Sequence, residues 1–188
     1  MSEAAGKPSV LRGMALLARF RTEGFGCFPA TSQGFLNSLA PLLAFPLVGA
    51  VFRLLGGNPV GALADALASL VALLAPAVVS HFLAQRWRRE AEWLRYAVAF
   101  NWCQSGMTVV VITVLSAVGV ATLGRPGASQ MLFAAMVGVL GYWLALCWFL
   151  AAKGLRLSGW RAVLLVIGVN LASAVLVLGP QLLLRAWP

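Results

Sequence analysis

Four polar side chains near the middle of the chain are the ones whose types and spacing could support chemistry: His81, Arg95, Asn101 and Gln104. Histidine titrates near neutral pH, so His81 could serve as an acid or a base. Asn101 and Gln104 are three residues apart, which places them on one helix face. One interpretation is a polar pocket that opens at the cytoplasmic ends of two adjoining helices.

A second interpretation is that these side chains hold helices together by hydrogen bonds, each worth about 1 kcal/mol in a membrane, and it is favoured. Asp65 and Asn170 raise the same question. Asp65 lies about one turn from the end of its span, so reaching water is favoured over a functional carboxylate. Asn170 lies near mid-depth, where an amide must find a partner, and helix association is favoured over ligand binding.

Known catalytic and cofactor motifs are mostly absent from this sequence. The chain has a single histidine and three widely separated cysteines without a CxxC pair. It has no P-loop, no G-x-G-x-x-G and no H-E-x-x-H. We therefore expect no catalytic residue, no cofactor, no metal site and no enzymatic activity. An integral membrane enzyme that uses His81 is a third hypothesis.

The composition is that of a membrane protein. Of the 188 residues, 61% are hydrophobic and 10% are charged, and the mean hydropathy is +0.90. A soluble domain carries about 25% charged residues. Apolar runs of this length predict an all-α, polytopic transmembrane helical bundle of five spans. The expected spans are about 35–55, 61–84, 96–123, 131–152 and 162–184. Gly138 and Gly141 in the fourth span are expected to allow close helix approach.

The chain divides into an amino-terminal segment, 1–34, and a five-span membrane domain, 35–188. Within the first segment, Val10–Phe20 has apolar residues at helical spacing, but Arg19 cuts the run too short to span a bilayer. Two alternatives follow. The stretch is either a short helix in the headgroup plane or a cytoplasmic tail that packs on the spans.

Basic residues set the orientation. Of the fourteen lysines and arginines, eleven fall on the amino-terminal side of a five-span layout and three on the other. The eleven are Lys7, Arg12, Arg19, Arg21, Arg86, Arg88, Arg89, Arg95, Lys153, Arg156 and Arg161, and the three are Arg53, Arg125 and Arg185. Because cytoplasmic loops are enriched in basic residues, this distribution predicts N-in and C-out. The expected location is a bacterial inner, or cytoplasmic, membrane.

A charged hairpin joins the second and third expected spans. Arg86, Arg88 and Arg89 end one helix, and Glu90 and Glu92 begin the next. This order complements both helix dipoles, which explains most of the charge structurally. The arginines would also contact anionic lipid headgroups or a protein partner. No nucleic-acid-binding motif occurs.

Phe100-Asn101-Trp102, after an aromatic entry from Trp93 to Tyr96, resembles the A-[YF]-N-W signature of a family of small uncharacterised alphaproteobacterial membrane proteins. The segment 34–38 (GFLNS) and Pro46 fit the same group, which implies no particular activity. The five-span layout is also similar in architecture to the Yip family of membrane-trafficking proteins. The sequence thus favours a membrane scaffold or accessory protein with a basic cytoplasmic face. The alternative is a small-solute transporter, or transporter subunit, with a polar pocket near the cytoplasmic ends of spans two and three. Membrane lipids are the expected partners, with a protein partner or a second copy as further possibilities.

Overall fold

A computed structural model describes the backbone of residues 9–57 and 59–186, with the side chains of these residues except Phe45, Asp65 and those of 177–186. The described residues form helices and no strand. The elements are α1 (Val10–Leu17), the 3-10 helix η1 (Thr22–Cys27), α2 (Ser32–Leu55), α3 (Pro59–Arg86), α4 (Glu90–Ala121), α5 (Ala128–Phe149), the π-helical turn η2 (Leu150–Gly154) and α6 (Gly159–Ala186). Five of the described helices are long and apolar enough to cross a membrane, which confirms the predicted fold class.

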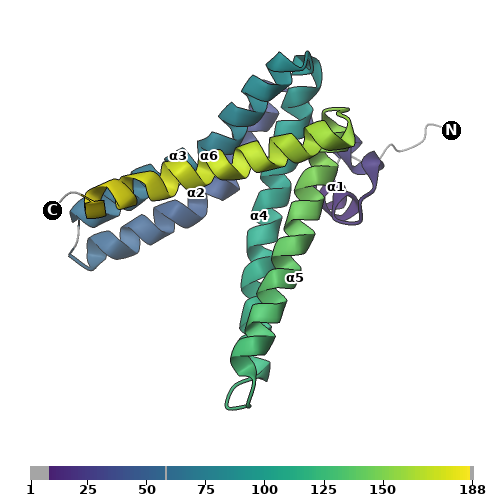
Figure 1. The fold of residues 1–188 in the computed structure, drawn as a ribbon. Coiled ribbons are helices and arrows are strands. Elements are labelled where there is room, and N and C mark those ends of the chain that lie inside the picture. Colours follow the sequence, from purple (N-terminus) through teal and green to yellow (C-terminus); the bar gives the residue numbers. More distant parts are fainter. Residues whose placement is uncertain (1–8, 58, 187–188) are drawn as a thin grey trace.

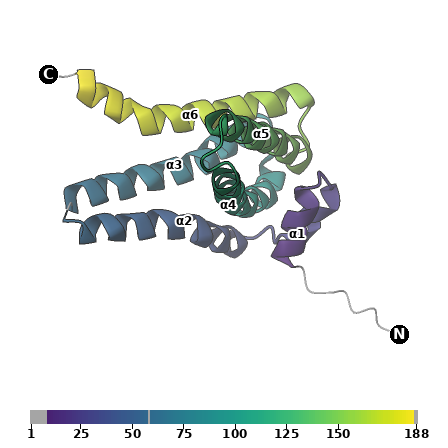
Figure 2. The ribbon, with the colours of Figure 1, turned by 90° about the horizontal axis from the view of Figure 1, so that it is seen from below.

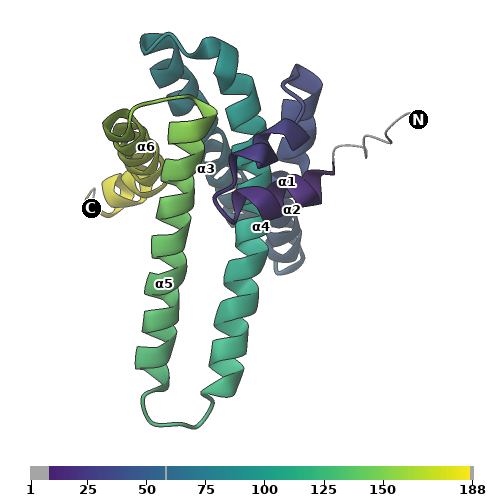
Figure 3. The ribbon, with the colours of Figure 1, turned by 90° about the vertical axis from the view of Figure 1, so that its right-hand side faces the viewer.

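The five long helices form two groups that diverge from a common junction (Figure 1). Helices α2, α3 and α6 lie side by side as a layer, with α3 in the middle (Figure 2). Helices α4 and α5 form an antiparallel hairpin that leaves this layer at a steep angle (Figure 3). The α3–α4 turn, the η2 region and α1 lie at the junction, whereas the α2–α3 and α4–α5 turns lie at the far ends of the two groups.

Local sequence signals explain where these helices begin and end. The hydroxyl of Thr31 accepts a hydrogen bond from the backbone N–H of Gly34 at 3.0 Å, so Thr31 is the N-cap of α2, as its residue type predicts. Glu90 and Glu92 occupy the first turn of α4. The far turns use Gly57, with φ +80°, and Gly127, with φ +84°, in the left-handed region that favours glycine.

The packed core lies at the junction, and the far parts of the helices have their apolar side chains outside. In the most apolar window of each long helix, only 12% to 18% of the residues are buried. Leu55, Val120 and Leu123 are 79%, 77% and 84% exposed. Apolar residues exposed on this scale suit a surface that faces lipid. The fully buried Leu17, Val98 and Leu150 come from three separate elements and meet in one cluster at the junction.

Candidate functional site

The amino-terminal residues 9–28, here called the N-terminal module, fold back on themselves and pack on the hairpin. A Cβ added to Gly13 would lie 2.8 Å from the ring of Phe28, so a glycine is needed for this approach. The hydroxyl of Tyr142 on α5 donates a hydrogen bond to the carbonyl of Ala18 at 2.6 Å. The ring of Phe20 meets that of Tyr142 edge-on at 5.9 Å. The module is therefore joined to the carboxyl-terminal half of α5.

The exposed surface of the module is both apolar and basic. Leu11 is 76% exposed and Phe20 is 43% exposed. Arg12, Arg19 and Arg21 are exposed beside them. This mixture is typical of a surface that contacts lipid headgroups.

Two turns at the junction place arginine in the left-handed backbone region. Arg88, in the α3–α4 turn, has φ +56°, and Arg156, in the turn before α6, has φ +51°. Both side chains are exposed. A residue other than glycine in this conformation costs roughly 1–2 kcal/mol. Arginine is thus present at two positions where glycine would be more stable.

The rest of the charged hairpin is only weakly paired. Arg89 approaches Glu92 at 3.7 Å, one turn apart on the surface of α4. Arg86 and Arg88 are exposed, and no carboxylate of the described residues lies within ion-pair distance of either. Lys153 is exposed in η2 nearby. We refer to the exposed basic residues of these two turns and of η2, Arg86, Arg88, Lys153 and Arg156, as the basic surface.

His81 lies on α3 just before this basic surface. Its Nε2 atom is 3.1 Å from the amide nitrogen of Gln85, and its ring meets that of Trp93 at 4.4 Å. The indole N–H of Trp93 donates to the hydroxyl of Ser80 at 3.1 Å. His81 Nδ1 is buried and has no hydrogen-bond partner among the described residues. The histidine therefore belongs to the contact between α3 and the start of α4.

Asn101 is buried on a different side of the bundle. Its amide nitrogen donates to the hydroxyl of Ser38 on α2 at 2.9 Å. Ser38 in turn donates to the carbonyl of Phe35 at 2.7 Å. Asn101 lies eight residues after Trp93, or about 12 Å along α4 at 1.5 Å per residue. It therefore does not face His81.

A small, half-polar cavity of about 200 Å³ lies between α3, α4, α5 and α6 and is here called the apex cavity. Its polar lining includes Tyr96, Gln104, Asn170 and Ser173. The amide nitrogen of Asn170 donates to the carbonyl of Val166 at 2.7 Å on its own helix. The side chains of Tyr96 and Gln104 make no hydrogen bond within the described part of the chain.

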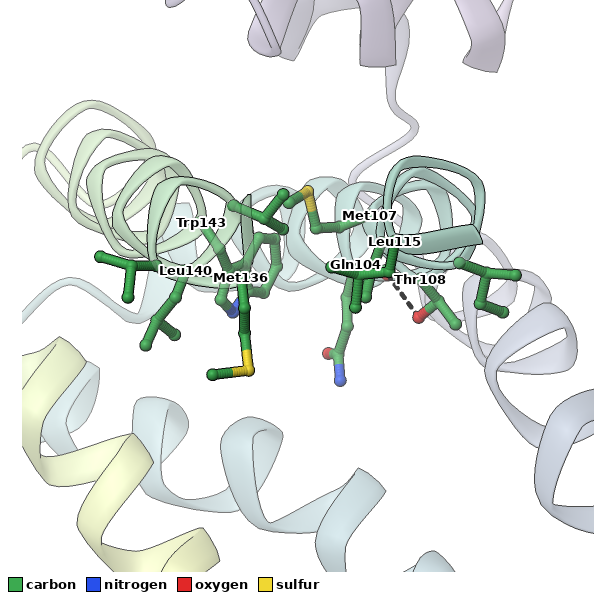
Figure 4. Close-up of a pocket in the computed structure, with 11 residues that line it drawn as sticks. Gln104, Met107, Thr108, Leu115, Met136, Leu140 and Trp143 are labelled. Atoms are coloured by element: carbon green, nitrogen blue, oxygen red, sulfur yellow. Dashed lines mark hydrogen bonds between the residues drawn. The ribbon is translucent and has the colours of Figure 1, made fainter. Parts of the chain in front are cut away.

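A larger groove of about 550 Å³ begins at the apex cavity and follows the α4–α5 hairpin. Gln104 and Trp143 line both spaces, so the groove and the cavity adjoin at these two side chains. Figure 4 shows Gln104, Met136 and Leu140 pointing from the hairpin toward the layer of α3 and α6. The remaining lining is almost entirely apolar, as in Met107 and Leu115. We call this space the hairpin groove.

The structure does not bring the four predicted pocket residues together. His81 packs on Trp93, Asn101 binds Ser38, and Arg95 is exposed. Gln104 instead shares the apex cavity with Asn170, which the sequence had placed apart as a separate polar residue. The side chain of Asp65 lies outside the described residues.

Two participants were missed by reasoning from sequence. The residues around Ser38 in the sequence give no sign that it has a special role. Those around Tyr96 indicate only a tyrosine at the membrane interface. Ser38 gains its partner because α2 packs against α4, and Tyr96 lines a cavity because α3, α5 and α6 surround its position on α4.

No group of three His, Cys, Asp or Glu side chains that could hold a metal ion occurs among the described residues. Comparison of the chain with protein-family models, with curated proteins and with solved structures finds no match.

Proposed function

We propose that this chain is an integral membrane scaffold or accessory protein whose basic surface binds anionic lipid headgroups on the cytoplasmic face of a bacterial inner membrane. The observation that carries the proposal is the exposed Arg88 and Arg156 at left-handed turn positions. Backbone conformations that cost stability are retained where the surroundings or the function require them. A glycine at either position would relieve the backbone strain, but it would remove the arginine side chain that can contact a lipid headgroup.

The surroundings of these two arginines support a lipid contact. A basic residue near an anionic membrane surface contributes about 1 kcal/mol of attraction. Arg86, Arg88, Lys153 and Arg156 are all exposed at the junction. The N-terminal module adds the exposed side chains of Leu11 and Phe20. Basic and apolar side chains together are the combination that holds a protein surface at the headgroup level.

A double substitution separates binding from stability. In the Arg88→Gly, Arg156→Gly variant, the turns lose two charges and gain the residue that their backbone favours. We expect the thermal midpoint in mild detergent to stay or rise. Lipids that co-purify with the protein should show phosphatidylglycerol reduced by about thirtyfold, from two lost contacts of about 1 kcal/mol each.

The matched control is Arg125→Gly, at the exposed α4–α5 turn on the far side of the molecule. It removes one arginine without touching the basic surface and should leave the co-purified phosphatidylglycerol unchanged. Equal phosphatidylglycerol in the double variant and the parent protein would overturn the lipid-binding function. A protein partner recovered in mild detergent and lost in the double variant would instead assign the basic surface to that partner.

A small-solute transporter is the second candidate, because Gln104 and Asn170 line a cavity between four helices. Its test is solute uptake into liposomes that contain the purified protein. Uptake that Asn170→Ala abolishes, with the folded yield unchanged, would favour the transporter over the scaffold.

A further inference from the structure

We propose that the apex cavity and the hairpin groove together bind one neutral lipid, whose head carries hydroxyl or carbonyl groups and whose tail is apolar. The head would occupy the apex cavity, and the tail would follow the groove along α4 and α5. This site is distinct from the basic surface and goes beyond the proposed function.

The apex cavity presents hydrogen-bonding groups that lack partners. Tyr96 is 2% exposed and lines the cavity, yet its hydroxyl makes no hydrogen bond within the described part of the chain. Gln104, near the middle of α4, offers an amide donor and acceptor. Asn170 uses one N–H on Val166 and leaves its carbonyl oxygen open. The open donors and acceptors of these side chains match a ligand that brings its own donor and acceptor.

Charge decides the class of lipid. Among the described residues, no charged side chain lines either space. A phosphate head would be brought into this lining without a cation, at a high desolvation cost. The tyrosine hydroxyl and the two amides are neutral groups that both donate and accept. They suit a hydroxyl or an ester carbonyl, such as those of a diacylglycerol.

The hairpin groove has the size and lining that a tail requires. Its volume of about 550 Å³ falls in the range of about 300–1,000 Å³ that is typical of small-molecule sites. Met107 and Met136 contribute flexible, polarisable side chains that adapt to irregular apolar ligands. Trp143 lies where the groove meets the cavity, against the ring of Phe100 at 5.8 Å. An aromatic wall therefore marks the boundary between head and tail.

The test uses the full chain in phosphatidylcholine liposomes with a trace of diacylglycerol that bears a photoreactive diazirine in its tail. After illumination, the labelled peptides are identified by mass spectrometry. We expect labels on α4 and α5 along the groove. Unlabelled diacylglycerol should reduce them at least about fivefold, and the same amount of added phosphatidylcholine should not.

Two kinds of variant test the assignment of head and tail. Tyr96→Phe and the double variant Gln104→Leu, Asn170→Leu remove the polar groups, and the double variant should lower labelling about thirtyfold for two lost membrane hydrogen bonds of about 1 kcal/mol each. Met136→Trp fills the groove and should lower labelling with the apex cavity intact. Gln130→Leu, an exposed glutamine at the other end of α5, is the matched control and should change nothing.

Labelling that phosphatidylcholine competes away as well as diacylglycerol does would overturn the proposal, since ordinary bilayer lipid would then fill the groove. Cross-links between two copies through α4 and α5, without lipid labels, would also overturn it. The Arg88→Gly, Arg156→Gly variant should keep full labelling, so failure at the basic surface and failure here are distinguishable.

Discussion

The amide nitrogen of Asn101 on α4 donates a hydrogen bond to the hydroxyl of Ser38 on α2, at 2.9 Å. Asn101 is 4% exposed and Ser38 is 0% exposed. The hydroxyl of Ser38 in turn donates to the carbonyl of Phe35, and the hydroxyl of Ser105 donates to the backbone carbonyl of Asn101 at 2.9 Å. This chain of hydrogen bonds joins the hairpin to the helix layer, so Asn101 positions the two groups of helices.

Ser38→Ala should destabilise the protein more than Asn101→Leu. Ser38→Ala leaves the buried amide of Asn101 without its acceptor, which costs about 1–3 kcal/mol. Asn101→Leu removes that amide and leaves a serine that still donates to Phe35, at a cost of about 1 kcal/mol. The measurement is reversible thermal or denaturant unfolding of the purified protein in detergent.

The double variant Ser38→Ala, Asn101→Leu completes the cycle. Its destabilisation should be smaller than the sum of the two single effects, because the two side chains contact each other. Simple additivity would contradict the proposed coupling. Thr108→Ala, about two turns further along α4, removes only a bond to the backbone of Gln104 and should have little effect.

Much of the fold could be predicted from sequence, because the long apolar runs and the glycine turns are local signals. The predicted span 35–55 corresponds to α2 (Ser32–Leu55), and the predicted span 61–84 corresponds to α3 (Pro59–Arg86). The candidate pocket could not be predicted in the same way. Asn101 and Gln104 share one side of α4 by spacing, but α2 contacts the first residue and the apex cavity takes the second. The tertiary structure decides which neighbouring helix contacts each position of α4, and a local sequence pattern does not determine this.

The prediction that Gly138 and Gly141 allow close approach of another helix was wrong within the chain. A Cβ added to Gly138 or Gly141 would meet no atom within 4 Å. A Cβ on Gly154 would lie 3.0 Å from the ring of Phe25 and 3.2 Å from that of Tyr96. Fourth-span glycines therefore face outward, and close packing occurs where the N-terminal module meets the end of α5.

Gly154→Ala should therefore lower the thermal midpoint, since the added methyl overpacks two aromatic rings at a cost of about 1–3 kcal/mol. Gly138→Ala is the matched substitution in α5, which directly precedes η2, and it should leave the midpoint unchanged or slightly raised, because alanine favours the helix. Unfolding in detergent measures both. Equal loss of stability in the two variants would contradict the packing assigned to Gly154.

Tyr142→Phe should loosen the N-terminal module without unfolding the hairpin. The substitution removes the hydroxyl that donates to Ala18 and keeps the ring that contacts Phe20. Loss of a hydrogen bond worth about 1 kcal/mol raises the fraction of molecules in which the N-terminal module is detached from α5 about fivefold. Trypsin should then cleave after Arg19 and Arg21 correspondingly faster. Trp148→Phe removes the bond from the indole to the carbonyl of Gly159 instead, and it should leave cleavage at these sites unchanged.

Arg125 and Arg156 form a matched pair of positions that tests the orientation of the chain in the membrane. Arg156 lies in the turn before α6 at the junction, and Arg125 lies in the α4–α5 turn at the far end of the hairpin. Both side chains are exposed. If the basic end faces the cytoplasm, a membrane-impermeant maleimide applied to intact cells should label Arg125→Cys, and it should label Arg156→Cys only after the membrane is opened. The background carries Cys27→Ser, since Cys103 and Cys147 are buried. Labelling of Arg156→Cys in intact cells would reverse the orientation and place the basic surface away from the cytoplasmic headgroups that it is proposed to bind.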